Sequence, residues 1–207
     1  MKLGARRPFH DGGAGLSVLR QFVQTVKEAK NPLKIHLVGH STGAILHAYL
    51  AAALAGLEPT LRVASASLLA PAATVDLFRT HYRPLLNAKA SAAGIDRMDI
   101  YNLSDKLELD DNVIKVYRKS LLYLVSRSFE EDPLPAGILG MDAYCNALGN
   151  EAKLSLKTSH GRVAGSKESN SESHGGFDND PLTMNTVLRR VLGKKPAVPF
   201  TSDSLRY

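Results

Sequence analysis

The sequence predicts an α/β fold, with a mainly parallel sheet of about four strands and flanking helices. Short aliphatic runs alternate along the chain with longer segments whose apolar residues recur at helical spacing. Strands separated by helices usually become parallel neighbours joined by right-handed crossovers. One strand-like run also passes directly through Gly-His-Ser-Thr-Gly into an apolar helix. These observations together indicate a parallel sheet covered by helices.

The first half of the chain is expected to alternate helix and strand. The patterns predict, in order, an amphipathic helix at 16–29, a strand at 33–38, a helix at 42–55 closed by Gly56, and a strand at 63–69. The first helix should end before Asn31-Pro32, because a proline disfavours a helical residue in front of it. The second strand runs into Ala70-Pro71.

The second half continues the alternation and adds a polar loop. The patterns predict a helix at 75–90, a strand at 97–103, a long helix at 112–130, a strand at 154–158, a loop at 159–173 and a last helix at 181–192. Gly193 and Pro196 should stop the last helix. The loop is rich in Ser, Gly and Lys, and we expect it to be mobile.

Composition indicates a single globular domain over residues 1–207, with a core at 14–193 and a tail at 194–207. Hydrophobic residues make up 44% of the chain and charged residues 22%. The net charge is +6, but the basic residues are scattered, so we expect no nucleic-acid partner. Cys145 is the single cysteine, which excludes an intrachain disulfide. The longest apolar stretch, 44–57, is too short to span a bilayer, and a cytoplasmic location is expected.

The most informative segment is the strand, turn and helix around Ser41. A G-x-S-x-G turn between a strand and a helix is typical of a nucleophile elbow, which exposes the serine hydroxyl at the carboxyl edge of a parallel sheet. The turn forces the serine into a strained backbone conformation. We expect Gly39 and Gly43 to be required because side chains there would clash with the neighbouring strand and helix. The backbone N–H of Thr42 would be one oxyanion donor.

A serine nucleophile needs a base, and the base needs an acid that orients it. With this elbow the chain resembles the α/β-hydrolase superfamily, whose triad follows the order serine, acid, histidine. The resemblance implies an acid after the second strand beyond the elbow, where Asp105 lies. Glu108, Asp110 and Asp111 are alternatives in the same acidic segment, and Asp110 or Asp111 is also suited to cap the helix expected at 112.

The resemblance also implies that the base lies between the last strand and the last helix. His174, in Ser-His-Gly-Gly-Phe-Asp-Asn-Asp, resembles the His-Gly segment of many of these hydrolases, and His160 is the alternative. His40 is expected to pack or hydrogen-bond beneath the elbow rather than to titrate in catalysis. His36 lies on a buried strand and is expected to be a satisfied core residue.

The sequence departs from the superfamily before the elbow. Only one helix precedes the elbow strand, so the resemblance covers the C-terminal half to two-thirds of that fold, over about residues 14–193. The segment from His10 to Gly13 lies in the wrong place for the second oxyanion donor and is expected to be a turn before the first helix. An incomplete sheet would leave an exposed edge strand, which could pair with a second copy or a partner chain.

The expected function is a serine hydrolase that acts on carboxylic esters by acyl transfer, similar to an esterase or lipase. Ser41 would attack the carbonyl, His174 would transfer the proton and Asp105 would orient the histidine. The substrate would be a small ester or acyl compound, and no cofactor or metal is expected. Asp178 and Asp180 could bind a metal, but capping of the last helix explains them more simply. The alternatives are an inactive remnant of a hydrolase and a non-enzymatic domain that binds a partner through the sheet edge.

Overall fold

A computed structural model describes residues 2–112, 118–130 and 135–206. Its sheet is parallel, and its strands are β1 (Ile35–His40), β2 (Arg62–Leu69), β3 (Gly94–Ile95), β4 (Met98–Leu103) and β5 (Leu154–Ser159). The strand order is β1-β2-β4-β5, with the short β3 paired to β2. The α/β class with a mainly parallel sheet is therefore confirmed. The two-residue β3 is an addition to the predicted strands, too short to give a periodic signal.

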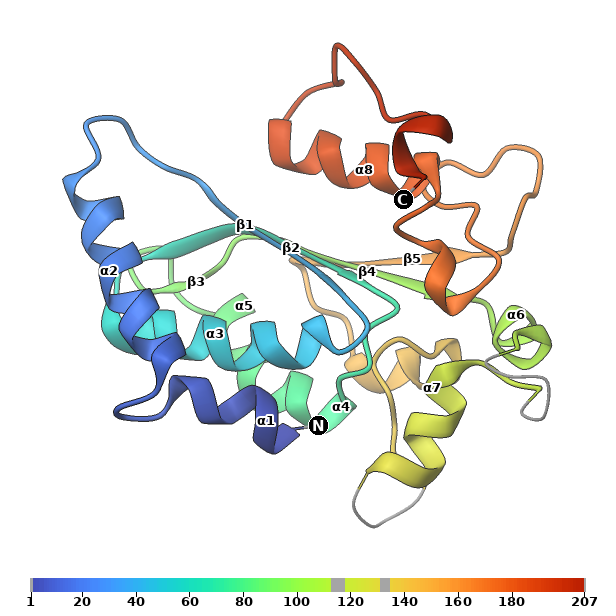
Figure 1. Cartoon of the computed structure of the whole chain (residues 1–207), viewed down its shortest axis with the longest axis horizontal. Helices are drawn as coiled ribbons and strands as arrows, with labels where there is room; N and C mark the ends of the chain where they lie inside the picture. Colours follow the sequence, from blue (N-terminus) through green and yellow to red (C-terminus); the bar gives the residue numbers. More distant parts are fainter. Residues whose placement is uncertain (1, 113–117, 131–134, 207) are drawn as a thin grey trace.

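Helices cover both faces of the sheet (Figure 1). The helical elements are α1 (Lys2–Arg6), η1 (Arg7–Phe9), α2 (Ala14–Glu28), α3 (Gly43–Leu57), α4 (Val75–Leu77), η2 (Phe78–Tyr82), α5 (Arg83–Leu86), α6 (Asp105–Asp110), α7 (Leu121–Leu124), η3 (Val125–Phe129), η4 (Asp142–Leu148), η5 (His174–Gly176), α8 (Pro181–Leu192) and η6 (Asp203–Leu205). On one face α3 packs on the sheet, with α1 and α2 against it, and α8 covers the other face.

The core is divided between the two faces of the sheet because side chains alternate along each strand. Met98 and Ile100 of β4 pack in the cluster that includes Ile45 of α3. Tyr101 and Leu103 belong instead to the cluster that includes Val187 of α8. Every residue of β4 is buried, as expected for a central strand covered by helices on both sides.

The predicted helices and strands at 16–29, 33–38, 42–55, 63–69, 97–103, 154–158 and 181–192 are present, with ends shifted by at most a few residues. Two predicted end signals at α8 are also present. Asp180 accepts hydrogen bonds from the N–H groups of Leu182 and Thr183, and Gly193 ends the helix with a φ of 68°.

Three local predictions were wrong. Gly56 lies inside α3, which continues to Leu57. The helix predicted to reach residue 90 ends at Leu86, and its middle, Phe78–Tyr82, is π-helical. The long helix predicted at 112–130 falls partly outside the described residues, and its later part begins only at Leu121.

The start of α7 is displaced because Ser120 is held by α6. The Ser120 N–H donates to the carbonyl oxygen of Glu108, and the Ser120 hydroxyl donates to the Glu108 carboxylate. These bonds keep Ser120 outside the helix that follows it. The acidic segment forms the short helix α6, whose first turn carries Asp105, where a negative charge interacts favourably with the helix dipole.

The strand β1 ends the strand order of the sheet, and Val38 on this strand is 43% exposed. Among the described residues, the outer edge of β1 is therefore paired with no other strand. Among the residues that the structure describes, no helix is long and apolar enough to cross a membrane.

Candidate active site

Ser41 occupies a strained turn between β1 and α3. Its φ of 53° lies in the left-handed region, which costs a residue other than glycine about 1–3 kcal/mol. The segment after β2 holds this conformation, because the Ser41 N–H donates to the carbonyl oxygen of Leu69 at 2.9 Å and Ala72 N–H donates to the Ser41 carbonyl oxygen at 3.0 Å. This is the strand, turn and helix geometry expected of a nucleophile elbow.

The two elbow glycines differ in their surroundings. A Cβ at Gly39 would lie 2.8 Å from Nδ1 of His47 and 3.1 Å from the backbone carbon of Gly43, so this glycine is required for close packing. A Cβ at Gly43 would meet nothing within 4 Å. The predicted clash at Gly43 is therefore wrong, because the first turn of α3 leaves open space there.

His174 lies next to Ser41. Its Nε2 is 3.0 Å from the Ser41 Oγ, and the residue is only 7% exposed. Burial lowers the pKa of His174 to about 4, assisted by the nearby His40 and opposed by the charges of Asp111 and Asp178. At neutral pH the ring is therefore uncharged, as a general base must be. The structure thus brings together the predicted nucleophile and the predicted base.

Two hydrogen bonds fix the backbone of His174. Asp111 Oδ2 accepts from the His174 N–H at 2.8 Å, and His40 Nε2 donates to the His174 carbonyl oxygen at 2.8 Å. The rings of His40 and His174 also stack with their centroids 5.3 Å apart. On its other side, His40 Nδ1 is 3.7 Å from Asp178 Oδ2. His40 thus lies beneath the elbow, and its contact with His174 was not foreseen, because no local pattern links positions so far apart in the chain.

The predicted acid Asp105 does not contact His174. Asp105 is exposed at the start of α6, where its carboxylate accepts a hydrogen bond from the Tyr123 hydroxyl at 2.9 Å. Glu108 is fully buried and bonded to Ser120, and burial raises its pKa to about 7. Asp110 ends α6 and is exposed. Of the four acidic residues considered, Asp111 is the one with a hydrogen bond to His174 within the described part of the chain.

The second ring nitrogen of His174 has no acceptor. For Nε2 to accept the Ser41 proton, Nδ1 must carry the ring hydrogen. That atom is buried and has no hydrogen-bond partner among the described residues. In a complete triad, an acidic side chain accepts a hydrogen bond from this ring nitrogen. No described residue does so here.

The remaining residues considered for the site are Thr42, the segment that begins at His10, His160 and His36. Thr42 is exposed and precedes α3, and no acceptor for its N–H lies among the described residues. The segment from His10 ends in Gly13, the N-cap of α2, so it is a turn as expected. His160 is exposed, and His36 Nδ1 is bonded to the Ser65 hydroxyl at 2.7 Å.

A cavity of about 890 Å³ lies next to His174 in the chain, with Ser173 and Gly176 in its lining. Asp180 is also among its lining residues, whereas Ser41 and His174 are not. Over the described ranges, no group of three metal-ligating side chains is present.

No family model matches the chain, and comparisons with curated proteins and with solved structures found no match either. The site is therefore interpreted from its own geometry.

Proposed function

We propose that this protein is a serine hydrolase of the α/β-hydrolase type that acts on carboxylic esters by acyl transfer. The observation that carries the proposal is the 3.0 Å contact between His174 Nε2 and Ser41 Oγ, at the end of a parallel strand in a strained turn. A strained serine beside a buried, neutral histidine is the arrangement that activates a hydroxyl. The parallel strands that follow the elbow in chain order add support from the fold.

The mechanism follows from these atoms. Ser41 Oγ attacks the ester carbonyl carbon while its proton passes to His174 Nε2. The Thr42 N–H, at the start of α3, would stabilise the negative oxygen of the tetrahedral intermediate. His174 then returns the proton to the departing alkoxide, and a water molecule repeats the sequence on the acyl-enzyme. The products are a carboxylic acid and an alcohol.

Asp111 is better supported than Asp105 as the acid that assists His174. Asp111 bonds to the backbone of His174, and its charge opposes the lowering of the histidine pKa. The superfamily resemblance favours Asp105, and the exposed position and Tyr123 partner of that residue argue against it.

The unpartnered Nδ1 of His174 favours a second candidate, a hydrolase remnant with little or no activity. In that case the open edge of β1 would serve to bind a second copy or a partner chain. The two candidates predict opposite results for chemical labelling of Ser41.

The experiment is labelling of the folded protein with a fluorophosphonate ester probe, with peptide mass spectrometry to locate the adduct. We expect labelling at Ser41 that is lost in Ser41→Ala and falls at least about 100-fold in His174→Ala, because general-base assistance contributes about 10²–10⁴-fold. The matched control is His160→Ala, an exposed histidine in the same part of the chain.

Labelling that persists unchanged in His174→Ala would show that this histidine is not the base. No labelling of the folded wild-type protein would favour the inactive candidate. If Ser41 is labelled, turnover of short acyl esters would distinguish an active esterase from a protein that only reacts with the probe.

A further inference from the structure

A second polar site lies on the sheet face covered by α8. Asp99 and Tyr101 of β4 are paired in register with Ser155 and Lys157 of β5. Because side chains alternate, these four residues point to the same face. A polar patch beneath a helix is unusual on the inner face of a parallel sheet, where aliphatic residues dominate.

Five basic side chains surround a cavity of about 390 Å³ at this place. They are Arg97, Lys157, Lys167, Arg189 and Arg190. The hydroxyl-bearing residues Ser155 and Thr186 also line it. The volume falls within the range of small-molecule binding sites, about 300–1,000 Å³.

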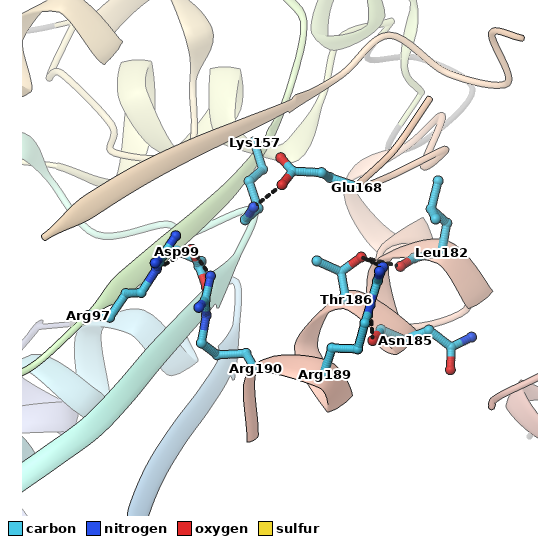
Figure 2. A network of polar contacts seen from close by, with 9 residues as sticks. All are labelled: Arg97, Asp99, Lys157, Glu168, Leu182, Asn185, Thr186, Arg189 and Arg190. Atoms are coloured by element: carbon cyan, nitrogen blue, oxygen red, sulfur yellow. Dashed lines mark hydrogen bonds and ion pairs between the residues drawn. The ribbon is translucent and has the colours of Figure 1, made fainter. Parts of the chain in front are cut away.

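Two carboxylates neutralise part of this charge (Figure 2). The buried Asp99 receives two hydrogen bonds from Arg190, at 2.6 and 3.2 Å, and lies 3.8 Å from Arg97. Glu168 pairs with Lys157, whose side chain is almost fully buried. Within the described residues, Lys167 and Arg189 have no carboxylate partner. Five cations and two carboxylates leave an excess of three positive charges around the cavity.

One buried polar atom near these charges, the Tyr101 hydroxyl, also has no partner within the described residues. Tyr101 is completely buried, and its hydroxyl has no hydrogen bond within the part of the chain that the structure describes. Burial is the main cause that raises the pKa of Tyr101, and the charges of Asp99 and Glu168 raise it further. The charges of Arg190 and Arg189 lower it. The Lys157 Nζ lies 5.8 Å from the centre of the Tyr101 ring. Tyr101 thus lies near Lys157, although it is not among the residues that line the cavity.

The proposed esterase chemistry does not use this site. Ser41 and His174 do not line the cavity. Arg189 and Arg190 are in the last turn of α8, whereas His174 precedes its first turn. The two cations without a carboxylate partner among the described residues, Lys167 and Arg189, are exposed, so their charge is available to a ligand in this cavity.

We propose that this cavity binds a small molecule carrying a phosphate or diphosphate group. Such groups carry two or more negative charges, which matches the excess of positive charge. Their oxygens accept hydrogen bonds from the forked guanidinium groups of arginine and from hydroxyls. A free inorganic phosphate and an organic phosphate share this chemistry, and the cavity has room for the larger ligand.

The test is isothermal titration calorimetry of the full chain with inorganic pyrophosphate, adenosine monophosphate and adenosine. We expect the two phosphates to bind and adenosine not to bind. Affinity should fall about 10-fold or more in the double variant Lys167→Gln/Arg189→Gln, because hydrogen bonds to charged groups are lost. Both positions are exposed, so folding should be unaffected. Arg190 is unsuitable because its loss would leave Asp99 buried and unpaired.

One further variant sharpens the test. Arg20→Gln, at an exposed cation in α2, is the matched control and should leave affinity unchanged. Binding that is equal in wild type and the double variant would overturn the proposal. An absence of phosphate binding would also overturn the proposal. Binding of a short duplex oligonucleotide in place of the small phosphates would overturn it as well.

Discussion

His40 Nε2 donates a hydrogen bond to the carbonyl oxygen of His174, so the residue before the strained serine holds the histidine that faces it. The bond links the end of β1 to the segment before α8, which is far away in the sequence. Asp111 binds the N–H of the same histidine from another direction. The position of His174 is therefore set by its backbone, whereas its Nδ1 has no partner within the described residues.

Asp111 is expected to matter more than Asp105 for reaction of Ser41. Asp111→Ala removes both a negative charge and the acceptor of the His174 N–H, so fluorophosphonate labelling should slow about 10-fold or more. Asp111→Asn should restore part of the rate because its side-chain oxygen can still accept that bond. Asp105→Ala should change the rate little. A larger effect at Asp105 than at Asp111 would return the role of the acid to Asp105.

Replacement of Ser41 should separate strain from chemistry. Ser41→Gly and Ser41→Ala both remove the hydroxyl, but glycine adopts the positive φ of this position without strain. We expect Ser41→Gly to exceed Ser41→Ala in free energy of unfolding by about 1 kcal/mol, as measured by urea denaturation. Equal stabilities would mean that residue 41 is not strained in solution.

The two elbow glycines should respond differently to alanine. Gly39→Ala places a methyl group against His47, and we expect a loss of about 1–3 kcal/mol in the free energy of unfolding. Gly43→Ala enters open space at the start of α3 and should be neutral or stabilising by up to about 1 kcal/mol. Thermal or urea unfolding of both variants provides the comparison. The double variant Gly39→Ala/His47→Ala should recover part of the loss, and no recovery would contradict the assigned clash.

Glu108 should make stability depend on pH. Its pKa is about 7 in the folded protein, raised mainly by burial from an ordinary value near 4.5. The folded protein therefore binds more protons than the unfolded chain between these values, and stability should fall as the pH rises from about 4.5 to about 7. Above this window, Glu108→Gln should raise the free energy of unfolding by on the order of 2–3 kcal/mol, with little effect below it.

The control for this titration is Glu172→Gln, because Glu172 is exposed and its loss should leave the pH profile unchanged. Urea unfolding at several pH values gives the measurement. A Glu108→Gln variant that parallels wild type at every pH would show that folding does not raise the pKa of this carboxyl group.

The acidic segment that contains Asp105 and Asp111 shows what could not be predicted from the sequence. Asp105 and Asp111 lie in one acidic segment, and their spacing alone did not distinguish them. The short helix α6 turns Asp105 toward solvent and Tyr123, and it places Asp111 near His174. A helix of this length is not stable by itself, because helix nucleation is costly, and its burial of Glu108 against Ser120 depends on the packed structure.

By itself, the sequence determined the parallel α/β architecture and the turn at Ser41. These features follow from local patterns, namely aliphatic runs and glycine positions. The preference for His174 over His160 came from the resemblance to the α/β-hydrolase superfamily, and the structure places His174 beside Ser41. The tertiary structure alone decided the clamp of His40 and Asp111 on His174 and the pairing of Asp99 with Arg190. These contacts join residues from distant segments, and their geometry depends on how α6, α8 and the sheet pack, which no local pattern specifies.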